Sequence, residues 1–384
     1  MEPLGWDAII ASIFVQLAPV WIGLIVIFAL SIAFKGRLSL YGKLMNSPIG
    51  MVGLAIVLFW VLSALFADQI ATFGALDQVA GLKNKKPGIA HPEIEGAYYL
   101  LGGDNLGRDV FSRMIYGSQS VLAIAPLATL FAFMVGVTLG LPAGYFGGLM
   151  DTILAFLANL VLAFPVILLF YLLVTPEIRE TGIPVALAGV LFLFPIVFFW
   201  VFFYSRFETR PETMYPLLAA TVVIGFWAYS GLAFNADPLG VFSMDPNLLN
   251  VFVSVVFVNS PTVFRIVRGL TMDIKTRDYV AAGQTRGEGP FYIMLWEILP
   301  NARGPLIVDF CLRIGYTTIL LGTLGFFGLG VSPESPDWGS TINEGRKLLS
   351  IFPHPALPPA IALMSLVLGL NLLADGLREQ SLKD

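Results

Sequence analysis

Long apolar runs constrain the fold of this chain more than any other feature. Nine such runs are separated by more polar segments, at 8–34, 49–67, 118–141, 150–175, 182–204, 215–235, 248–264, 304–330 and 356–376. A helix of about 20 apolar residues crosses the roughly 30 Å hydrocarbon core of a bilayer. Charged residues make up only 12% of the chain, about half the usual share in a soluble domain. The sequence therefore predicts an all-α, polytopic membrane protein.

The distribution of Lys and Arg predicts the orientation of these helices. Lys35, Arg37 and Lys43 follow the first run, and cytoplasmic loops carry an excess of such residues. We therefore expect the N-terminus outside, residues 331–355 outside and the C-terminus in the cytoplasm. The basic residues at the other expected cytoplasmic positions agree: Arg206, Arg210, Arg265, Arg268, Lys275, Arg277, Arg286, Arg303, Arg378 and Lys383.

The loop 68–117 is the main exception to this charge pattern. It is expected outside although it contains Lys83, Lys85, Lys86, Arg108 and Arg113. At about fifty residues, the loop is near the length beyond which the charge rule weakens.

Two patterns inside the runs concern the packing of helices. Gly136, Gly140 and Gly144 recur every fourth residue, and a stripe of small residues lets two helix backbones approach closely. Asp309 and Arg313 lie one helical turn apart, and either charge alone would cost about 2.5–3.5 kcal/mol at the bilayer centre. We interpret them as a structural i, i+4 ion pair in preference to an ion or proton site.

Residues that could hold a metal or a cofactor are scarce. Cys311 is the single cysteine and lies in an apolar run, while His91 and His354 each stand beside a proline in a polar or proline-rich stretch. We expect no cofactor, no metal site, no catalytic residue and no nucleic-acid partner. The chain also lacks a G-x-x-x-x-G-K-[ST] phosphate-binding motif, so ATP-driven transport would need an ATPase on another polypeptide.

The stretch DYVAAGQTRGEGPFYIMLWEILPN (278–301) is polar and interrupted by glycines between two apolar runs. Its first part predicts a short helix that the GEGP turn ends, and its second part predicts a helical run that Pro300 stops. Gly287 is either a left-handed helix cap, a point of close approach or an ordinary turn glycine. A connection between two spans needs only a few residues, so we interpret 265–303, here named the coupling loop, as a surface presented to the cytoplasm.

These residues resemble the cytoplasmic loop of the permease subunits of ATP-binding-cassette (ABC) importers. That loop has the form E-A-A, three residues, G, and a spacer that ends in L-P. The matching residues are Ala281, Ala282, Gly283, Gly287, Leu299 and Pro300, with Ala281 in place of the Glu and Gly283 in place of the second Ala. The resemblance implies contact with an ATPase through Arg277, Asp278, Tyr279 and Arg286 as well as these six.

Four further stretches are similar to the second, C-type permease of dipeptide and oligopeptide importers. They are LGGDNLGRDVFSRMIYGSQSVLAIA (101–125), GYFGGLMDTILA (144–155), LGFFGLGVSPESPDWGSTINEG (324–345) and NLLADGLREQ (371–380). The first resembles an LGTDxLGRDxxSRxxYG signature, with Gly103 where Thr is usual. The residues that carry this periplasmic motif are Gly102, Asp104, Gly107, Arg108, Asp109, Ser112, Arg113, Tyr116 and Gly117.

The resemblance covers residues 40–171 and 247–384 and implies a six-helix type I importer core with about three extra transmembrane helices. The expected parts are an N-terminal helix and linker (1–48), the first part of the core (49–171), an inserted pair of helices (172–246) and the second part of the core (247–384). We expect the inserted pair to pack on the rim of the core, as a lipid-facing or partner-docking addition.

The function that the resemblance implies is that of a permease subunit of an ABC importer in a bacterial or archaeal plasma membrane. Its implied partners are a second homologous permease in a heterodimer, two ATPase subunits, an extracytoplasmic substrate-binding protein and the lipid bilayer. Dipeptides, oligopeptides or a related small solute are the expected cargo. A secondary transporter or channel is the alternative, but it would place several carboxylates at the midplane. An intramembrane enzyme would need catalytic residues inside the spans.

Overall fold

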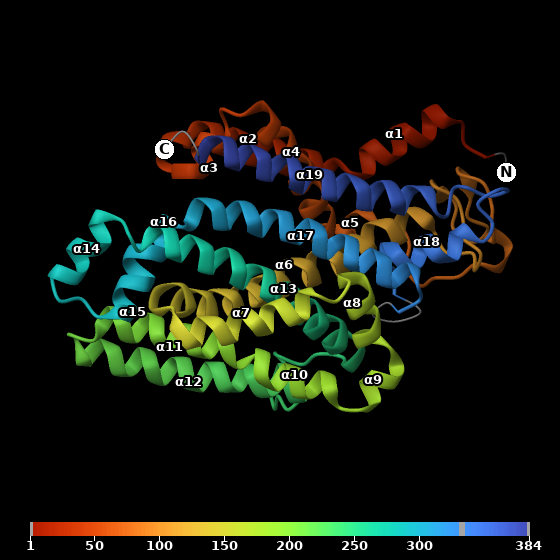
Figure 1. Ribbon diagram of the computed structural model, residues 1–384. Coiled ribbons are helices and arrows are strands. Elements are labelled where there is room, and N and C mark those ends of the chain that lie inside the picture. The colour runs from red at the N-terminus through yellow and green to blue at the C-terminus, as the bar shows by residue number, and fades with distance from the viewer. Residues whose placement is uncertain (1–2, 330–334, 382–384) are drawn as a thin grey trace. The chain divides into compact units, whose positions relative to one another are not determined.

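The computed structural model describes residues 3–329 and 335–381, and their regular secondary structure is almost all helix (Figure 1). Residues 330–334 of the 324–345 motif lie outside the described residues, and so do the first four residues of the 331–355 segment (331–334) and Lys383. The chain forms two compact units, and α6 (Val110–Phe146) and α17 (Arg303–Phe326) contribute to both. Unit 1 comprises Met1–Pro126 and Cys311–Asp384, and unit 2 comprises Leu127–Phe310.

Unit 1 holds both ends of the chain. Besides parts of α6 and α17, its elements are α1 (Trp6–Gln16), α2 (Ala18–Ala33), η1 (Lys35–Arg37), α3 (Ser39–Leu44), α4 (Pro48–Leu65), α5 (Ala67–Ile70), η2 (Ala80–Leu82), β1 (Ile89–Ala90), β2 (Tyr98–Tyr99), α18 (Trp338–Arg346) and α19 (Leu357–Ser381). The strands β1 and β2 pair antiparallel, with Ile89 opposite Tyr99.

Glycines set the packing of α4 against α19 in unit 1. A Cβ added to Gly376 would lie 2.4 Å from the Cα of Gly50, and one added to Gly53 would lie 2.3 Å from the backbone nitrogen of Leu373. Small residues let helices approach in this way when lipid removes the hydrophobic drive for association. The two backbones are therefore in direct contact.

Unit 2 contains the coupling loop and the segment 172–246. Its elements, besides parts of α6 and α17, are α7 (Gly148–Leu162), α8 (Val166–Val174), α9 (Pro176–Glu180), α10 (Ile183–Leu191), α11 (Leu193–Phe207), α12 (Pro211–Phe234), α13 (Pro246–Ile274), α14 (Asp278–Thr285), α15 (Pro290–Tyr292), the π-helical η3 (Ile293–Ile298) and α16 (Leu299–Asn301). Helices α11 and α12 pack along one another, as Figure 1 shows.

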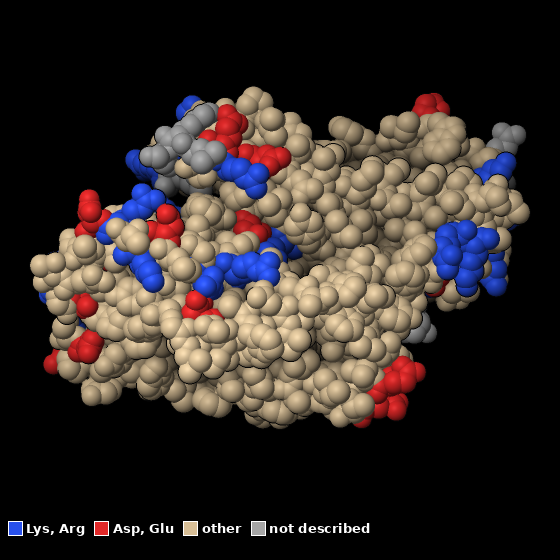
Figure 2. Space-filling model, in the orientation of Figure 1, with Lys and Arg blue, Asp and Glu red and all other residues tan. Residues whose placement is uncertain are grey.

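The all-α, polytopic fold is confirmed. Over the described residues, six single helices and the stretch α10–α11 (Ile183–Phe207) are long and apolar enough to cross a membrane, and the bent pairs α1–α2 (53°) and α7–α8 (82°) would raise the number of spans from seven to nine. All nine expected runs fall on these elements. Pro19 is the second residue of α2 and Pro165 directly precedes α8, so both bends lie beside residues that lack a backbone donor. Much of the face in Figure 2 is uncharged, as a surface in lipid requires.

Two expected boundaries were wrong. Helix α6 begins at Val110 instead of 118, so Ser112, Arg113, Tyr116 and Gly117 lie on the helix and not in the preceding loop. Helix α13 continues to Ile274 instead of ending at 264, so the first ten residues of the 265–303 loop are helical. The polar side chains that weaken the apolar pattern of α13 bond its own backbone, as Ser254 does to Asn250 and Ser260 to Val256.

Helix α13 packs directly against the glycine stripe of α6. A Cβ added to Gly136 would lie 2.5 Å from Cγ1 of Val263, and one added to Gly144 would lie 2.7 Å from the carbonyl oxygen of Arg268. At Gly140 the same atom would lie 2.9 Å from Cβ of Val267. Real Cβ atoms do not approach so closely, so the stripe fixes the separation of the two helices.

We expect Gly136→Ala to destabilise the protein, because Val263 and the backbone of α13 must move to admit the methyl group. Gly269→Ala is the matched control: Gly269 lies on α13 with nothing near its Cβ position, and Ala there should be neutral or favourable by up to about 1 kcal/mol. Thermal unfolding of the two variants in detergent tests this. An unchanged midpoint for Gly136→Ala would contradict the close packing of the stripe.

Candidate functional site

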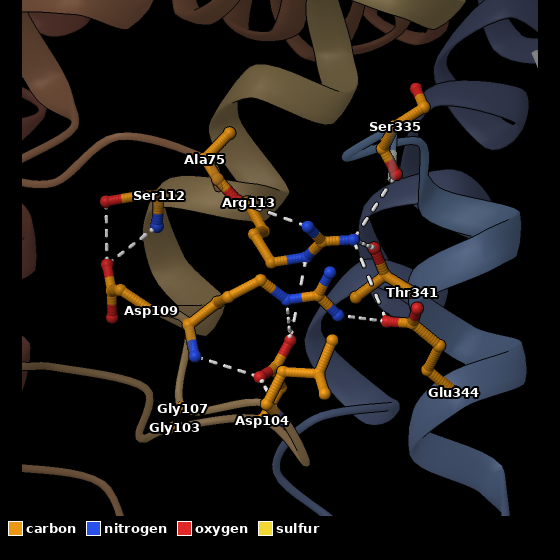
Figure 3. Close-up of polar contacts among 12 residues, drawn as sticks. Ala75, Gly103, Asp104, Gly107, Asp109, Ser112, Arg113, Ser335, Thr341 and Glu344 are labelled. Atoms are coloured by element: carbon orange, nitrogen blue, oxygen red, sulfur yellow. Dashed lines mark hydrogen bonds and ion pairs between the residues drawn. The ribbon is translucent and has the colours of Figure 1, made fainter. Parts of the chain in front are cut away.

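Two of the segments that resemble importer permeases meet in unit 1 around a buried charge network (Figure 3). The network consists of Asp104, Arg108 and Arg113 from the first segment and Glu344 from the second. The side chains of both arginines are at most 2% exposed. Charges removed from water to this extent must be paired and hydrogen-bonded, so the four side chains depend on one another.

A tight turn before α6 places Asp104 and Arg108 together. Gly107 has a φ of +81°, and a Cβ on it would lie 2.2 Å from the carbonyl oxygen of Val79, so the turn requires glycine. Oδ1 of Asp104 accepts hydrogen bonds of 2.9 Å from the backbone N–H groups of Leu106 and Arg108. Oδ2 accepts one of 2.6 Å from Nε of Arg108.

The two guanidinium groups extend from this turn toward α18. Arg108 donates to Glu344, and Arg113 lies 3.8 Å from the same carboxylate oxygen. Arg113 also donates to the carbonyl oxygen of Ala75 at 3.1 Å and to Oγ1 of Thr341 at 3.4 Å. The network therefore ties the start of α6 to α18 across more than two hundred residues of sequence.

Asp109 caps the first turn of α6. Its Oδ2 accepts hydrogen bonds from the backbone N–H of Ser112 at 2.8 Å and from the Ser112 hydroxyl at 2.7 Å, the usual role of an Asp at an N-cap. Burial raises the pKa of Asp109 to about 6 in spite of these hydrogen bonds. Its other carboxylate oxygen is buried and has no hydrogen-bond partner among the described residues.

The remaining residues of the periplasmic motif pack against the same region. Gly117 faces Trp338, whose Cδ1 would lie 2.6 Å from an added Cβ, and Tyr116 donates to Oδ1 of Asp68 at 3.0 Å. Gly102 has a φ of +85°. At Gly103, where Thr is usual, a Cβ would lie 2.0 Å from the carbonyl oxygen of Leu82, so this backbone excludes the larger residue.

Glu344, Thr341 and Trp338 take part in this arrangement although sequence reasoning did not select them. All three lie in the DWGSTINEG part of the 324–345 segment, so their place in a second matching motif was the available signal. Trp338 is fully buried and donates its indole N–H to the carbonyl oxygen of Met114 at 2.8 Å. Asp104 and both arginines are closed off from solvent, while Glu344 is 24% exposed, so the network serves to join elements of unit 1.

We expect Asp104→Asn to destabilise the protein by about 3–5 kcal/mol, because it leaves two buried guanidinium groups with one carboxylate. Arg378→Gln is the control, since Arg378 and Asp375 form an exposed pair with a separation of 3.8 Å and such pairs contribute about 0–1 kcal/mol. Unfolding in detergent measures both. Equal losses of stability in the two variants would show that the network is not held by its charges.

The second predicted site, the coupling loop, lies in unit 2, and its part beyond α13 begins at Lys275. Lys275 donates from Nζ to the carbonyl oxygens of Gly144 at 2.8 Å and Tyr145 at 3.2 Å, where α6 ends. A cation at the C-terminus of a helix is favourable because the last carbonyl groups lack partners. The entry to the loop is therefore fixed to the end of α6.

Helix α14 shows two different faces. Val280 and Gly283 are buried, while Tyr279, Ala281 and Ala282 are exposed. Arg277 and Asp278 precede and begin the helix, also exposed, and Arg277 forms an ion pair of 3.0 Å with Asp273. The exposed face therefore combines small residues with a tyrosine ring and charges at its edge.

Gly287 ends α14 with a φ of +80°. Its N–H donates to the carbonyl oxygen of Gln284 at 3.0 Å, and the N–H of Glu288 donates to that of Gly283 at 3.3 Å. These two bonds define a Schellman cap, which requires a left-handed residue at the position of Gly287. A Cβ there would meet no atom of the chain, so within this chain the requirement for glycine comes from the backbone angle alone.

The chain then returns through a π-helical turn. Pro300 does not stop the second helical run as expected; the helix continues to Asn301 and η3 lies directly before Leu299. A proline lacks the N–H for the i−4 carbonyl and its ring collides with that carbonyl, so a wider π turn accommodates it. Arg286 donates to Glu297 at 2.7 Å and so connects the end of α14 to η3.

The intramembrane residues Asp309 and Arg313 both lie in α17, where Arg313 is buried and Asp309 is half-buried. Each has an interaction partner in the structure. Their mutual ion pair stays a prediction. Cys311 lies between them and is half-buried.

The two histidines make structural contacts in unit 1. Nδ1 of His91 accepts hydrogen bonds from the backbone N–H groups of Glu93 and Ile94. Nε2 of His354 lies 3.1 Å from the carbonyl oxygen of Gly103, and burial lowers the pKa of His354. Neither histidine belongs to a group of metal-binding side chains among the described residues.

Comparisons with known proteins give one consistent result. The family described as binding-protein-dependent transport system inner membrane component matches residues 136–381. The dipeptide transport system permease protein DppC of Haemophilus influenzae is 29% identical over 332 residues, which are 86% of this chain and 88% of that protein. The glutathione transport system permease protein GsiD of Pectobacterium atrosepticum is 31% identical over 296 residues, 77% of this chain and 73% of that protein.

A second DppC, from Alkalihalophilus pseudofirmus, is 25% identical over 339 residues, 88% of this chain and 87% of that protein. The similarity therefore extends along most of the chain and is shared by relatives with different named cargoes. Because the family match also spans more than half of the chain, this protein belongs to the inner-membrane components of binding-protein-dependent transport systems: it is a permease subunit of an ABC importer and not an enzyme.

Proposed function

We propose that this chain is one half of the membrane pathway of an importer for dipeptides, oligopeptides or a related small solute. Two relatives are named for dipeptide transport and one for glutathione transport, and both of these cargoes are short peptides. In this proposal the chain pairs with a second, homologous permease as a heterodimer. Two ATPase subunits bind on the cytoplasmic side, and a binding protein delivers the substrate from outside.

One observation carries the proposed coupling to ATP: one face of α14 is packed against the protein and the other face is exposed. Val280 is fully buried and the Schellman cap at Gly287 fixes the end of the helix, while Ala281 and Ala282 remain exposed. Small exposed side chains on a rigid short helix leave room for a partner's surface. In Figure 2, charged side chains gather near the α14 end of unit 2 as labelled in Figure 1, as expected of a segment outside lipid.

Transport then requires the ATPase subunits to bind one conformation of the permease better than the other. The residues proposed to contact them are Arg277, Asp278, Tyr279, Ala281, Ala282, Gly283, Arg286, Gly287, Leu299 and Pro300. Of these, Gly283 is buried against Glu297 and Arg286. Its proposed role is therefore to support the exposed face of α14.

Ala282→Glu should leave the permease folded, because Ala282 is exposed, and should sharply reduce its binding to the ATPase subunits, because a charged side chain then occupies the small face. Thr213→Glu, at an exposed position at the start of α12, is the matched control. Co-purification of the ATPase subunits and ATP hydrolysis in vesicles measure the effect. Normal ATPase binding by Ala282→Glu would refute the coupling role of α14.

The proposed orientation places the N-terminus outside and the coupling loop and the C-terminus in the cytoplasm. In a Cys311→Ser background, Thr285→Cys should be protected from an impermeant thiol reagent added outside, whereas Ser350→Cys should react. Both positions are exposed; Ser340, in the same expected outer segment as Ser350, is unsuitable because it is buried and bonds Asp337. The opposite labelling pattern would reverse the topology.

A further inference from the structure

Helix α11 belongs to the segment 172–246, for which the sequence predicts a place on the rim, yet one of its faces packs on the coupling loop. Phe198 and Phe202, four residues apart, contact a buried cluster that includes Ile293 and Ile298 of η3. The opposite side of α11 is different, since Phe199 and Trp200 are exposed. Helix α11 therefore has exposed aromatic side chains on one side and packs on the coupling loop with the other.

The closest contacts of this face surround Trp296, which lies in the π-helical turn. Its indole N–H donates to Oγ of Ser205 at 3.2 Å, and its ring centroid lies 4.8 Å from that of Phe202. The guanidinium carbon of Arg206 lies 4.7 Å from the centre of the Trp296 ring, which is the geometry of a cation–π contact. We name these four residues, Phe202, Ser205, Arg206 and Trp296, the tryptophan latch.

Next to the latch, the packing between α11 and the coupling loop leaves a cavity. An apolar cavity of about 250 Å³ lies there, lined by residues that include Val137, Thr138, Val197, Phe198, Phe291 and Leu295. A void has no partner atoms for the side chains that line it. The latch therefore supplies the directional contacts of this interface, and the cavity leaves the two sides free to shift if the latch opens.

We propose that the tryptophan latch makes α11 a positioning element for coupling: Arg206 and Ser205 hold Trp296, so that α14, η3 and the inserted helices move as one body when ATP is bound. This inference rests on the proposed function of the coupling loop. Arg206 touches neither ATP nor substrate in this scheme; it acts through Trp296. In this proposal the inserted segment takes part in the movement that couples ATP binding to transport, in addition to the lipid-facing place that the sequence predicts for it.

The motion can be tested directly in the complete complex with its ATPase subunits. Spin labels at Thr209→Cys and Thr285→Cys, both exposed, are introduced in a Cys311→Ser background. Their distance distribution is measured by electron spin resonance with and without ATP plus vanadate. With the latch intact, the distribution should stay narrow and keep its mean in both states, whereas Arg206→Gln should broaden it. A mean that shifts equally with and without the latch would overturn the proposal.

A functional readout separates positioning from simple stability. In vesicles with the binding protein, supplied with the ligand it carries when purified, Arg206→Gln should lower the binding-protein-dependent part of ATP hydrolysis about threefold to tenfold. Its unfolding midpoint should be unchanged, because Arg206 is exposed. Arg206→Lys, which keeps a cation over the ring, should restore most of the coupling. Arg210→Gln, an exposed arginine four residues further on, is the control and should have no effect.

The two proposals fail in different ways. If Ala282→Glu retains ATPase binding, the proposed function of the coupling loop is wrong. If Ala282→Glu loses that binding while Arg206→Gln and Trp296→Phe couple normally, only the latch proposal is wrong. An equal loss of coupling in Arg210→Gln and Arg206→Gln would also overturn it, because general surface charge and not the contact with Trp296 would then be responsible.

Discussion

The absence of water in the bilayer core is the constraint on which this structure depends. A backbone N–H or C=O in hydrocarbon must find its partner within the protein, which leaves helices as the elements of an apolar chain such as this one. Lipid also removes the hydrophobic drive between helices, so contact must come from close packing. The glycines of α6 against α13, and of α4 against α19, meet that need. The part of the coupling loop beyond Ile274 is held at the end of the α6–α13 pair by Lys275.

Charged side chains correspondingly lie where the protein supplies partners for them. The charge network of Asp104, Arg108, Arg113 and Glu344 joins two segments of unit 1 that are distant in sequence. Several basic residues of the coupling loop have a carboxylate or carbonyl partner, as Arg268 has in Asp151 and Lys275 in the end of α6. Such partners cost little where water is near and are obligatory where it is excluded.

The sequence predicted the fold class and all nine positions of apolar runs, because length and apolarity are read directly from residue types. It failed at the helix ends near polar residues. The start of α6 was placed too late, since Asp109, Ser112 and Arg113 read as loop residues although an N-cap and buried pairing accommodate them. Pro300 read as a stop, but a π turn absorbs it. These outcomes depend on tertiary partners, which a local pattern does not contain.

The candidate sites divide in the same way. The residues of the exposed α14 face follow from a local motif, whereas Glu344 and Trp296 matter through contacts with residues far away in sequence. No periodicity indicates that the end of α11 meets η3. The aromatic residues of α11 suit lipid and protein equally well, and only the folded chain distinguishes the two faces.

The π turn before Pro300 has a geometric consequence of its own. A π turn has a hydrogen bond between residues five apart, whereas an α turn has one between residues four apart. The π turn therefore contains one more residue than the α turn that it replaces. If η3 changed to α-helical bonding, everything on one side of it would rotate by about 100° and advance by about 1.5 Å relative to the other. Trp296 lies in that turn, with its ring held by α11. Under the latch proposal, the contacts of Trp296 with α11 oppose such a change between α14 and the helix α17 that follows.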